Sequence, residues 1–172
     1  MRKKPMLAYP VSDKPIDYSK PVFIQPKLDG VRCVIQGEKC YNGNYDVIAY
    51  SRTGKEWKNI DHILSQLKPF FQKYPNVILD GELYNHDFKD DFESIISMVR
   101  KTKPTDEDRL KSAENVQFHC YDIIDEELLY DHRNEFINQS LMLLGDSIHI
   151  VDTNLVDDHD LPHLYTSLVL KI

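Results

Sequence analysis

The stretch Lys27-Leu28-Asp29-Gly30-Val31-Arg32 places a lysine, an aspartate, a glycine and an arginine within six residues. Apolar runs flank it at 21–24 and 33–35, which predicts a strand, a tight turn and a second strand. A lysine beside an arginine on rigid elements suits attack on a phosphate, because neighbouring positive charge and desolvation favour the neutral amine. Gly30 permits a close backbone approach or a positive φ, and Arg32 offers a planar fork of donors to phosphate oxygens.

The same six residues also fit an ordinary β-hairpin. Asp-Gly is a common turn dipeptide, and the lysine and the arginine would then be solvated residues of an edge strand. The rest of the chain has to decide between these two interpretations.

Composition sets broad limits on the class of protein. The chain has 172 residues, 41% hydrophobic and 28% charged, which is enough for one globular domain with a core. No apolar run approaches the roughly 18 residues needed to span a bilayer, and prolines and charges interrupt the basic N-terminus before a signal-peptide core. The three cysteines, Cys33, Cys40 and Cys120, have no Cys-x-x-Cys spacing. We therefore expect an intracellular, reducing compartment, no membrane contact and no structural zinc.

The charge is unevenly distributed along the chain. Residues 1–58 hold 11 Lys and Arg against 6 Asp and Glu, whereas the remainder holds 10 against 22, for a net charge of −7. A basic first third permits a phosphate-binding surface on an acidic protein, although such segregation is also common in solvated surfaces.

The hydrophobic periodicity predicts a mixture of strands and helices. We expect strands at 22–24, 31–36, 45–50, 77–84, 116–124 and 147–151, and helices at 60–74, 90–100, 134–144 and 159–170. Pro69 should weaken the second half of the first helix. Because no βαβ rhythm is present, the pattern favours an α+β fold with antiparallel sheets flanked by helices.

Four short segments of the chain carry the residues that matter for function, and they follow one another in a fixed order. They are Lys27–Arg32, Ser51-Arg52-Thr53-Gly54-Lys55, Leu79-Asp80-Gly81-Glu82-Leu83 and Phe118-His119-Cys120-Tyr121-Asp122-Ile123. In this order and at these spacings the chain resembles the ATP-dependent DNA ligases, from about Pro5 to its end. These enzymes form the covalent nucleotidyltransferase superfamily together with RNA ligases and mRNA-capping guanylyltransferases.

The resemblance implies an ATP-grasp-like nucleotidyltransferase fold, the adenylation domain, and a three-step reaction. Lys27 matches the nucleophile that attacks the ATP α-phosphate and holds AMP as a phosphoramidate. AMP then passes to the 5′-phosphate of nicked duplex DNA, and the 3′-hydroxyl displaces it. Arg32 and Arg52 match arginines that bind the nucleotide and the DNA 5′-phosphate. Glu82 matches a glutamate at the ribose and the metal site, and Tyr121 matches the aromatic residue that stacks on adenine.

Each of these residues also has a plain structural interpretation. Glu82 fits a solvent-facing strand position, Tyr121 fits a core position, and Arg52 fits a weak surface ion pair. Lys55 is at most a phosphate contact. Asp29 and Asp80 fit turn formers, caps or groups near a metal, and Asp122 has no assigned role.

The resemblance is incomplete at the C-terminal side. A Glu-Gly strand motif, a lysine-rich motif and an oligonucleotide-binding (OB-fold) domain should follow, and residues 167–172 match neither motif. We therefore expect 1–172 to be a partial adenylation domain, incomplete at the C-terminus and without the OB-fold domain. Its isolated activity should be impaired, because missing electrostatic groups at a phosphoryl-transfer site cost orders of magnitude each.

Two further functions stay open. One is an RNA ligase or capping-type nucleotidyltransferase, and the other is a catalytically silent fragment that binds nucleotide or nicks. His159 and His163 stand at helical spacing near several aspartates, which fits zinc but fits an acidic helix start better.

The resemblance also implies the partners. We expect ATP and Mg²⁺ as cofactors, nicked duplex DNA as substrate, a monomer, and a role in DNA repair, replication or recombination. The small size and the many Lys, Asn, Asp, Ile and Tyr residues suggest a virus or phage, with the protein in the cytoplasm of the host cell.

Overall fold

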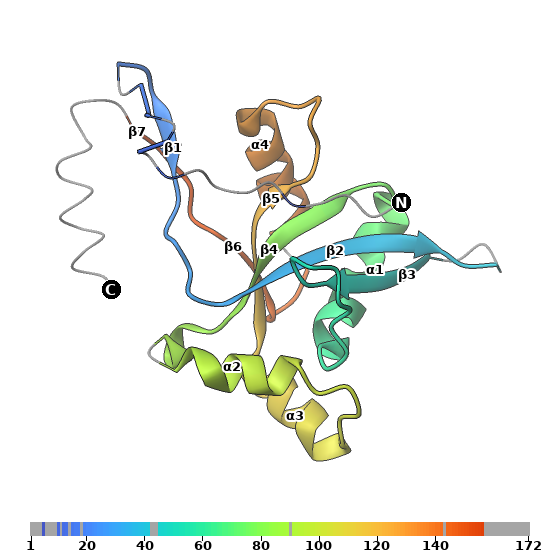
Figure 1. Cartoon of the computed structure of the whole chain (residues 1–172). Coiled ribbons are helices and arrows are strands. Elements are labelled where there is room, and N and C mark those ends of the chain that lie inside the picture. The colour runs from blue at the N-terminus through green and yellow to red at the C-terminus, as the bar shows by residue number, and fades with distance from the viewer. Residues whose placement is uncertain are drawn as a thin grey trace. The chain divides into compact units, whose positions relative to one another are not determined.

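The computed structural model describes residues 5, 10, 12–13, 15–17, 19–41, 45–89, 91–142 and 144–156. The chain divides into two compact units. Unit 1 is built on Leu28–Ile150, and unit 2 contains the described residues of Met6–Lys27 and Val151–Ile172. Figure 1 labels the elements of both units.

Unit 1 is organised around a five-stranded sheet. Its strands are β2 (Val31–Lys39), β3 (Tyr45–Tyr50), β4 (Ile78–Tyr84), β5 (Gln117–Ile123) and β6 (Ile148–Ile150). They stand in the order β3-β2-β4-β5-β6. All neighbours are antiparallel except the β5–β6 pair, which is parallel.

Four α-helices and one short 3-10 helix complete unit 1. They are α1 (Asp61–Lys73), η1 (His86–Phe88), α2 (Phe92–Val99), α3 (Asp106–Asn115) and α4 (Tyr130–Leu141). Helix α1 packs against β3, and α4 packs against β5 and β6 (Figure 1).

One face of the sheet forms the core with these helices. Alternate residues of the strands are fully buried there, because successive side chains of a strand point to opposite faces: Cys33, Ile35, Leu79, Leu83, Phe118 and Cys120. The helices contribute their apolar faces, at Ile63, Leu67, Ile95, Val99, Ile137 and Leu141. The opposite face of the sheet is therefore left for polar side chains.

Unit 2 contains a two-stranded antiparallel sheet. Strand β1 (Val22–Ile24) pairs with β7 (Asn154–Val156), with Phe23 opposite Leu155. A side-chain hydrogen bond from Gln25 to Thr153, at 2.9 Å, extends the pairing beyond the strands.

The structure confirms the predicted α+β class and corrects several elements. The alternative interpretation of Lys27–Arg32 as an ordinary β-hairpin is wrong, because β1 pairs with β7 and β2 pairs with β3 and β4. Helix α3 and strand β7 were not predicted, and α4 begins four residues earlier than expected, at Tyr130. The predicted helix at 159–170, with both of its histidines, lies outside the described residues.

Candidate functional site

Three ionisable side chains form a row across the polar face of the sheet in unit 1. Arg32 of β2 is the register partner of Glu82 of β4, and Glu82 is the partner of His119 of β5. Residues directly opposite each other in an antiparallel pair place their side chains on the same face. Segments that are far apart in the sequence therefore meet here.

Arg32 lies between an aspartate and an aromatic ring. Its Nε donates to Asp80 Oδ1 at 2.8 Å, and its Nη2 forms an ion pair with the other carboxylate oxygen. Its guanidinium lies 5.2 Å from the centre of the Tyr121 ring. Desolvation by burial raises the pKa of Asp80, against the opposing effect of hydrogen bonds from Arg32 and Tyr121. The three side chains thus form one cluster whose cation is already oriented.

The sequence left the role of Asp80 open, and the structure supplies it. The Asp80 side chain is only 2% exposed, whereas that of Arg32 is 24% exposed. A carboxylate this deeply buried and paired by two donors holds the guanidinium in one orientation. Asp80 is therefore the residue that fixes Arg32, and not a turn former.

Gly30 is close to the strand that carries Glu82. A Cβ atom built on Gly30 would lie 2.4 Å from the Leu83 carbonyl oxygen and 2.6 Å from Glu82 Cγ. Among the described glycines only Gly54 and Gly145 have a positive φ. Glycine is thus required at position 30 for close packing against β4, and the Asp-Gly pair does not form a hairpin turn.

Tyr121 is the extra residue of a β-bulge in β5. The β4–β5 register shifts between Asp80 and Gly81, so that Asp80 faces Asp122 while Gly81 faces Cys120. A bulge bends its strand and redirects the side chain that it carries. Burial, together with the nearby Asp80 carboxylate, raises the pKa of the Tyr121 hydroxyl, which keeps it protonated.

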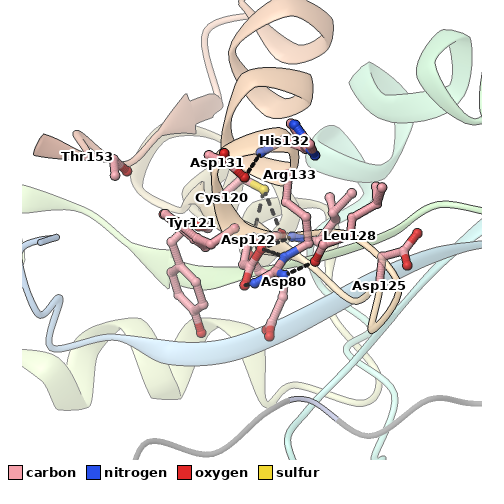
Figure 2. A network of polar contacts seen from close by, with 12 residues as sticks. Asp80, Cys120, Tyr121, Asp122, Asp125, Leu128, Asp131, His132, Arg133 and Thr153 are labelled. Carbon is pink, nitrogen blue, oxygen red and sulfur yellow. Dashed lines mark hydrogen bonds and ion pairs between the residues drawn. The ribbon is translucent and has the colours of Figure 1, made fainter. Parts of the chain in front are cut away.

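A second buried ion pair lies directly beyond the bulge. Arg133 of α4 donates from Nε and Nη2 to the two carboxylate oxygens of Asp122, at 2.7 and 3.0 Å. Its Nη1 donates to the Leu128 carbonyl at 2.6 Å. Figure 2 shows this network, with the Tyr121 ring pointing away from it. The sequence analysis did not single out Arg133, because nothing in a helical sequence marks a partner in another element.

A cluster of histidines continues the polar face beyond Glu82. The rings of His119 and His149 stack at 4.7 Å, and the Tyr84 ring lies edge-on to His119 at 5.2 Å. The Tyr84 hydroxyl is 3.0 Å from Nδ1 of His86. Desolvation, with smaller effects of the two other histidines, lowers the pKa of His119 to about 4. His119 is therefore neutral near neutral pH.

The structure places the other two predicted site residues on other segments of the chain. Arg52 is exposed in the turn after β3, which Ser51 and Lys55 close by a backbone hydrogen bond of 2.7 Å. Strand β3 is two positions away from β4 in the sheet. Lys27 is exposed and belongs to unit 2, directly before the first residue of Leu28–Ile150.

Comparison with known proteins identifies the family. The family model described as "ATP dependent DNA ligase domain" matches residues 5–169. Because this match covers nearly the whole sequence, the chain belongs to the ATP-dependent DNA ligase domain family.

Curated relatives agree over a shorter stretch. A DNA ligase of African swine fever virus, from a South African tick isolate, is 41% identical over 65 residues, which are 37% of this chain and 15% of the viral protein. The DNA ligase of a Kenyan pig isolate is 39% identical over 71 residues, or 41% of this chain and 16% of the relative.

Solved structures share the fold. The structure named "Pmar-Lig_Pre." matches with a TM-score of 0.69 and 21% identity, over 96% of this chain and 39% of that one. A structure titled "DNA binding with a minimal scaffold: Structure-function analysis of Lig E DNA ligases" matches with a TM-score of 0.66 and 18% identity, over 99% of this chain and 59% of that one. The chain thus spans about two fifths to three fifths of the length of these structures. In the part of the chain that the structure describes, no helix has both the length and the apolar character that crossing a membrane requires.

Proposed function

We propose that this chain is the nucleotide-binding part of an ATP-dependent DNA ligase that seals 5′-phosphate/3′-hydroxyl nicks in duplex DNA. The observation that carries the proposal is the cluster of Arg32, Glu82 and Tyr121 on one face of the sheet in unit 1. An aromatic ring, a cation and a carboxylate at one place are the groups that a nucleoside phosphate requires. The matching lysine stands five residues before Arg32.

The first step forms a covalent bond between the protein and AMP. The neutral amine of Lys27 attacks the α-phosphorus of ATP, the N–P bond forms, the bond to the β-phosphate bridging oxygen breaks, and pyrophosphate leaves. Phosphoryl transfer of this kind depends mostly on positioning and on neutralising charge. Arg32 supplies fixed positive charge to the phosphate, and Tyr121 supplies a surface on which the adenine ring stacks.

Mg²⁺ fits these residues only together with the nucleotide. Within the described residues no group of three His, Cys, Asp or Glu side chains could hold a metal ion. Glu82 is the carboxylate of the row that would hold the ion. Mg²⁺ commonly binds one or two carboxylates plus phosphate oxygens, and when bound it would neutralise charge on the phosphates.

The later steps act on the DNA. AMP passes from Lys27 to the 5′-phosphate at the nick, and the 3′-hydroxyl then displaces AMP as the new phosphodiester forms. Arg32 and Arg52 are the cations that would bind the 5′-phosphate. We further propose that the protein acts as a monomer inside the cell, with an OB-fold domain outside this chain.

Intact mass spectrometry after incubation with ATP and Mg²⁺ tests the first step. We expect the wild type to gain one AMP and Lys27→Ala to gain none. Lys20→Ala is the matched control, because Lys20 is also exposed, lies in unit 2 and forms an exposed ion pair with Asp17. An adduct on Lys27→Ala would refute the assignment of the nucleophile.

Three further measurements would point to the alternative functions: adduct formation from GTP, sealing of nicked RNA, and ATP binding without an adduct. An adduct formed from GTP in place of ATP would indicate a capping-type enzyme, and sealing of nicked RNA but not nicked DNA would indicate an RNA ligase. ATP binding without any adduct would indicate a catalytically silent nucleotide-binding fragment.

A further inference from the structure

We infer that Arg133 and Asp122 are positioning residues for the nucleotide, because they hold the bulge that aims Tyr121. This inference rests on the proposed function of Tyr121 as the base-stacking residue. It concerns two residues to which the sequence motifs gave no role.

The bulge is the place where the strand pairing does not fix the orientation of a site residue. At a bulge one residue is inserted into the ladder, so the regular hydrogen bonds no longer fix its orientation. Tyr121 is that residue here, and the shift from the Asp80–Asp122 pair to the Gly81–Cys120 pair brackets it. Other contacts must therefore define the direction of its ring.

The first turn of α4 provides those contacts. Arg133 holds the Asp122 carboxylate through two hydrogen bonds, and the same carboxylate accepts the Ile123 backbone N–H at 2.8 Å. The Tyr130 hydroxyl donates to the Tyr121 carbonyl at a long 3.5 Å. The Arg133 guanidinium also lies 5.4 Å from the centre of the Tyr130 ring. The backbone directly after the Tyr121 side chain, at the Tyr121 carbonyl and at Asp122, is thus attached to one helix.

Burial makes this attachment specific. The side chains of Arg133 and Asp122 are only 11% and 12% exposed. A buried pair with two parallel hydrogen bonds has one favoured geometry, and removal of either partner leaves the other unpaired. The pair therefore transmits the position of α4 to the bulge.

The charges of the cluster depend on Arg133 as well. Asp122 faces Asp80 across the β4–β5 pair, and its charge contributes to the raised pKa of Asp80. With Arg133 in place, each aspartate has its own arginine: Asp80 has Arg32 and Asp122 has Arg133.

Fluorine NMR on protein labelled with 3-fluorotyrosine tests the positioning directly. The resonance of residue 121 is assigned by its loss in Tyr121→Phe. We expect this resonance to shift or broaden in Asp122→Asn and in Arg133→Gln. The matched control is Asp61→Asn, which breaks the exposed ion pair between Asp61 and Arg109 in the same unit and should leave the resonance unchanged.

Isothermal titration calorimetry tests whether the orientation of Tyr121 affects nucleotide affinity. It compares the binding of ATP with the binding of inorganic tripolyphosphate. Both are measured in a Lys27→Ala background, which prevents adduct formation. Base stacking on an aromatic ring contributes a factor of roughly 5 to 150 in affinity. We expect Asp122→Asn and Arg133→Gln to weaken ATP about tenfold and tripolyphosphate by less than about twofold. A merely structural role would weaken both ligands alike.

The outcomes separate this inference from the proposed function. An unchanged Tyr121 resonance, or equal weakening of ATP and tripolyphosphate, would overturn the positioning role. A shifted resonance with unchanged ATP affinity would overturn its connection to the nucleotide. Tyr121→Ala is measured in parallel, and if it binds ATP as tightly as the parent, the proposed role of Tyr121 fails independently of the bulge.

Discussion

Gly81 is packed as closely against its neighbouring strand as Gly30 is. A Cβ atom built there would lie 2.4 Å from the His119 carbonyl oxygen and 2.6 Å from the Phe118 ring. Backbone atoms cannot move aside in the way that the end of a flexible side chain can. The glycine therefore allows β4 and β5 to approach closely beside the bulge that carries Tyr121.

We predict that Gly81→Ala destabilises the protein by about 2 kcal/mol or more, since overpacking of a filled interior costs about 1–3 kcal/mol. Gly37→Ala is the control in a neighbouring strand, where the added atom would meet Pro75 O at 3.2 Å and Phe71 at 3.3 Å. It should cost no more than about 1 kcal/mol. Urea unfolding of the two variants measures the difference, and equal midpoints would contradict the prediction.

The sequence predicted candidate site residues but not the side chains that hold them in place. Arg32, Glu82 and Tyr121 were singled out from short motifs, and the structure gathers them on one face. The partners Asp80 and Arg133 could not be assigned, because an ion pair between distant segments depends on strand register and helix position. Neither leaves a local pattern in the sequence.

Among the elements, the β5–β6 pair carries a pH-sensitive contact. His119 and His149 are register partners, and their stacked rings lie beside Tyr84 and near His86. The pKa of His119 falls from 6.5 to about 4, first because of desolvation. Between these two values the unfolded chain binds a proton that the folded chain does not, so stability rises with pH across this window. The contribution is complete above pH 6.5 and is lost as the pH falls toward 4.

We predict that the contribution of His119 to the free energy of unfolding drops by about 2–3 kcal/mol between pH 7 and pH 4. His119→Gln should show a correspondingly smaller loss over this range. His132→Gln, in an exposed position on α4, should keep the wild-type dependence. Chemical denaturation at several pH values measures this, and parallel curves for wild type and His119→Gln would refute the prediction.

Helix α1 contains a proline in its interior, at Pro69. Proline has no N–H, so the Ser65 carbonyl loses its usual helical donor. The helix forms nevertheless, because Ile63, Leu67, Phe70 and Phe71 are buried in the core. Tertiary packing has overridden the local propensity here.

We expect Pro69→Ala to stabilise the protein by about 1–2 kcal/mol, the regained helical bond being partly offset by a more flexible unfolded chain. Lys68→Ala, at the adjacent exposed position, should stay within about 0.5 kcal/mol of the wild type. Thermal unfolding of both variants checks this, and a lower midpoint for Pro69→Ala would show that the proline fits its position.

Element prediction succeeded where the hydrophobic pattern was strong and failed where it was weak. Helix α3 was missed because it is highly polar and buries only Ser112 among its residues. The available signal was its capping box, in which Thr105 and Asp108 exchange hydrogen bonds. Strand β7 was missed for a different reason, because three residues paired with a segment near the other end of the sequence carry no local periodicity.

For the molecule as a whole, the two units differ in how their structure is supported. The fully connected hydrophobic core lies within Leu28–Ile150, and none of its members belongs to the described residues of unit 2. Strands β1 and β7 form a two-stranded sheet, which by itself is only marginally stable in water. Among the described residues of unit 2, Val151 and Val156 are buried apolar side chains.

We predict that the amides of β1 and β7 exchange with solvent through local opening, at least about a hundredfold faster than the amides of β2 and β4, which should open only with the core. The reason is that the inner strands β2 and β4 are paired on both sides and contribute side chains to the hydrophobic core, whereas β1 and β7 have no such support among the described residues. Hydrogen exchange followed by mass spectrometry at rising urea concentration makes the comparison. Exchange of the 22–24 segment that is as slow and as urea-sensitive as that of 78–84 would mean that the two units unfold as one. Because Lys27 follows β1 by three residues, early opening of this strand would place the proposed nucleophile on a segment that opens independently of the Arg32–Tyr121 cluster.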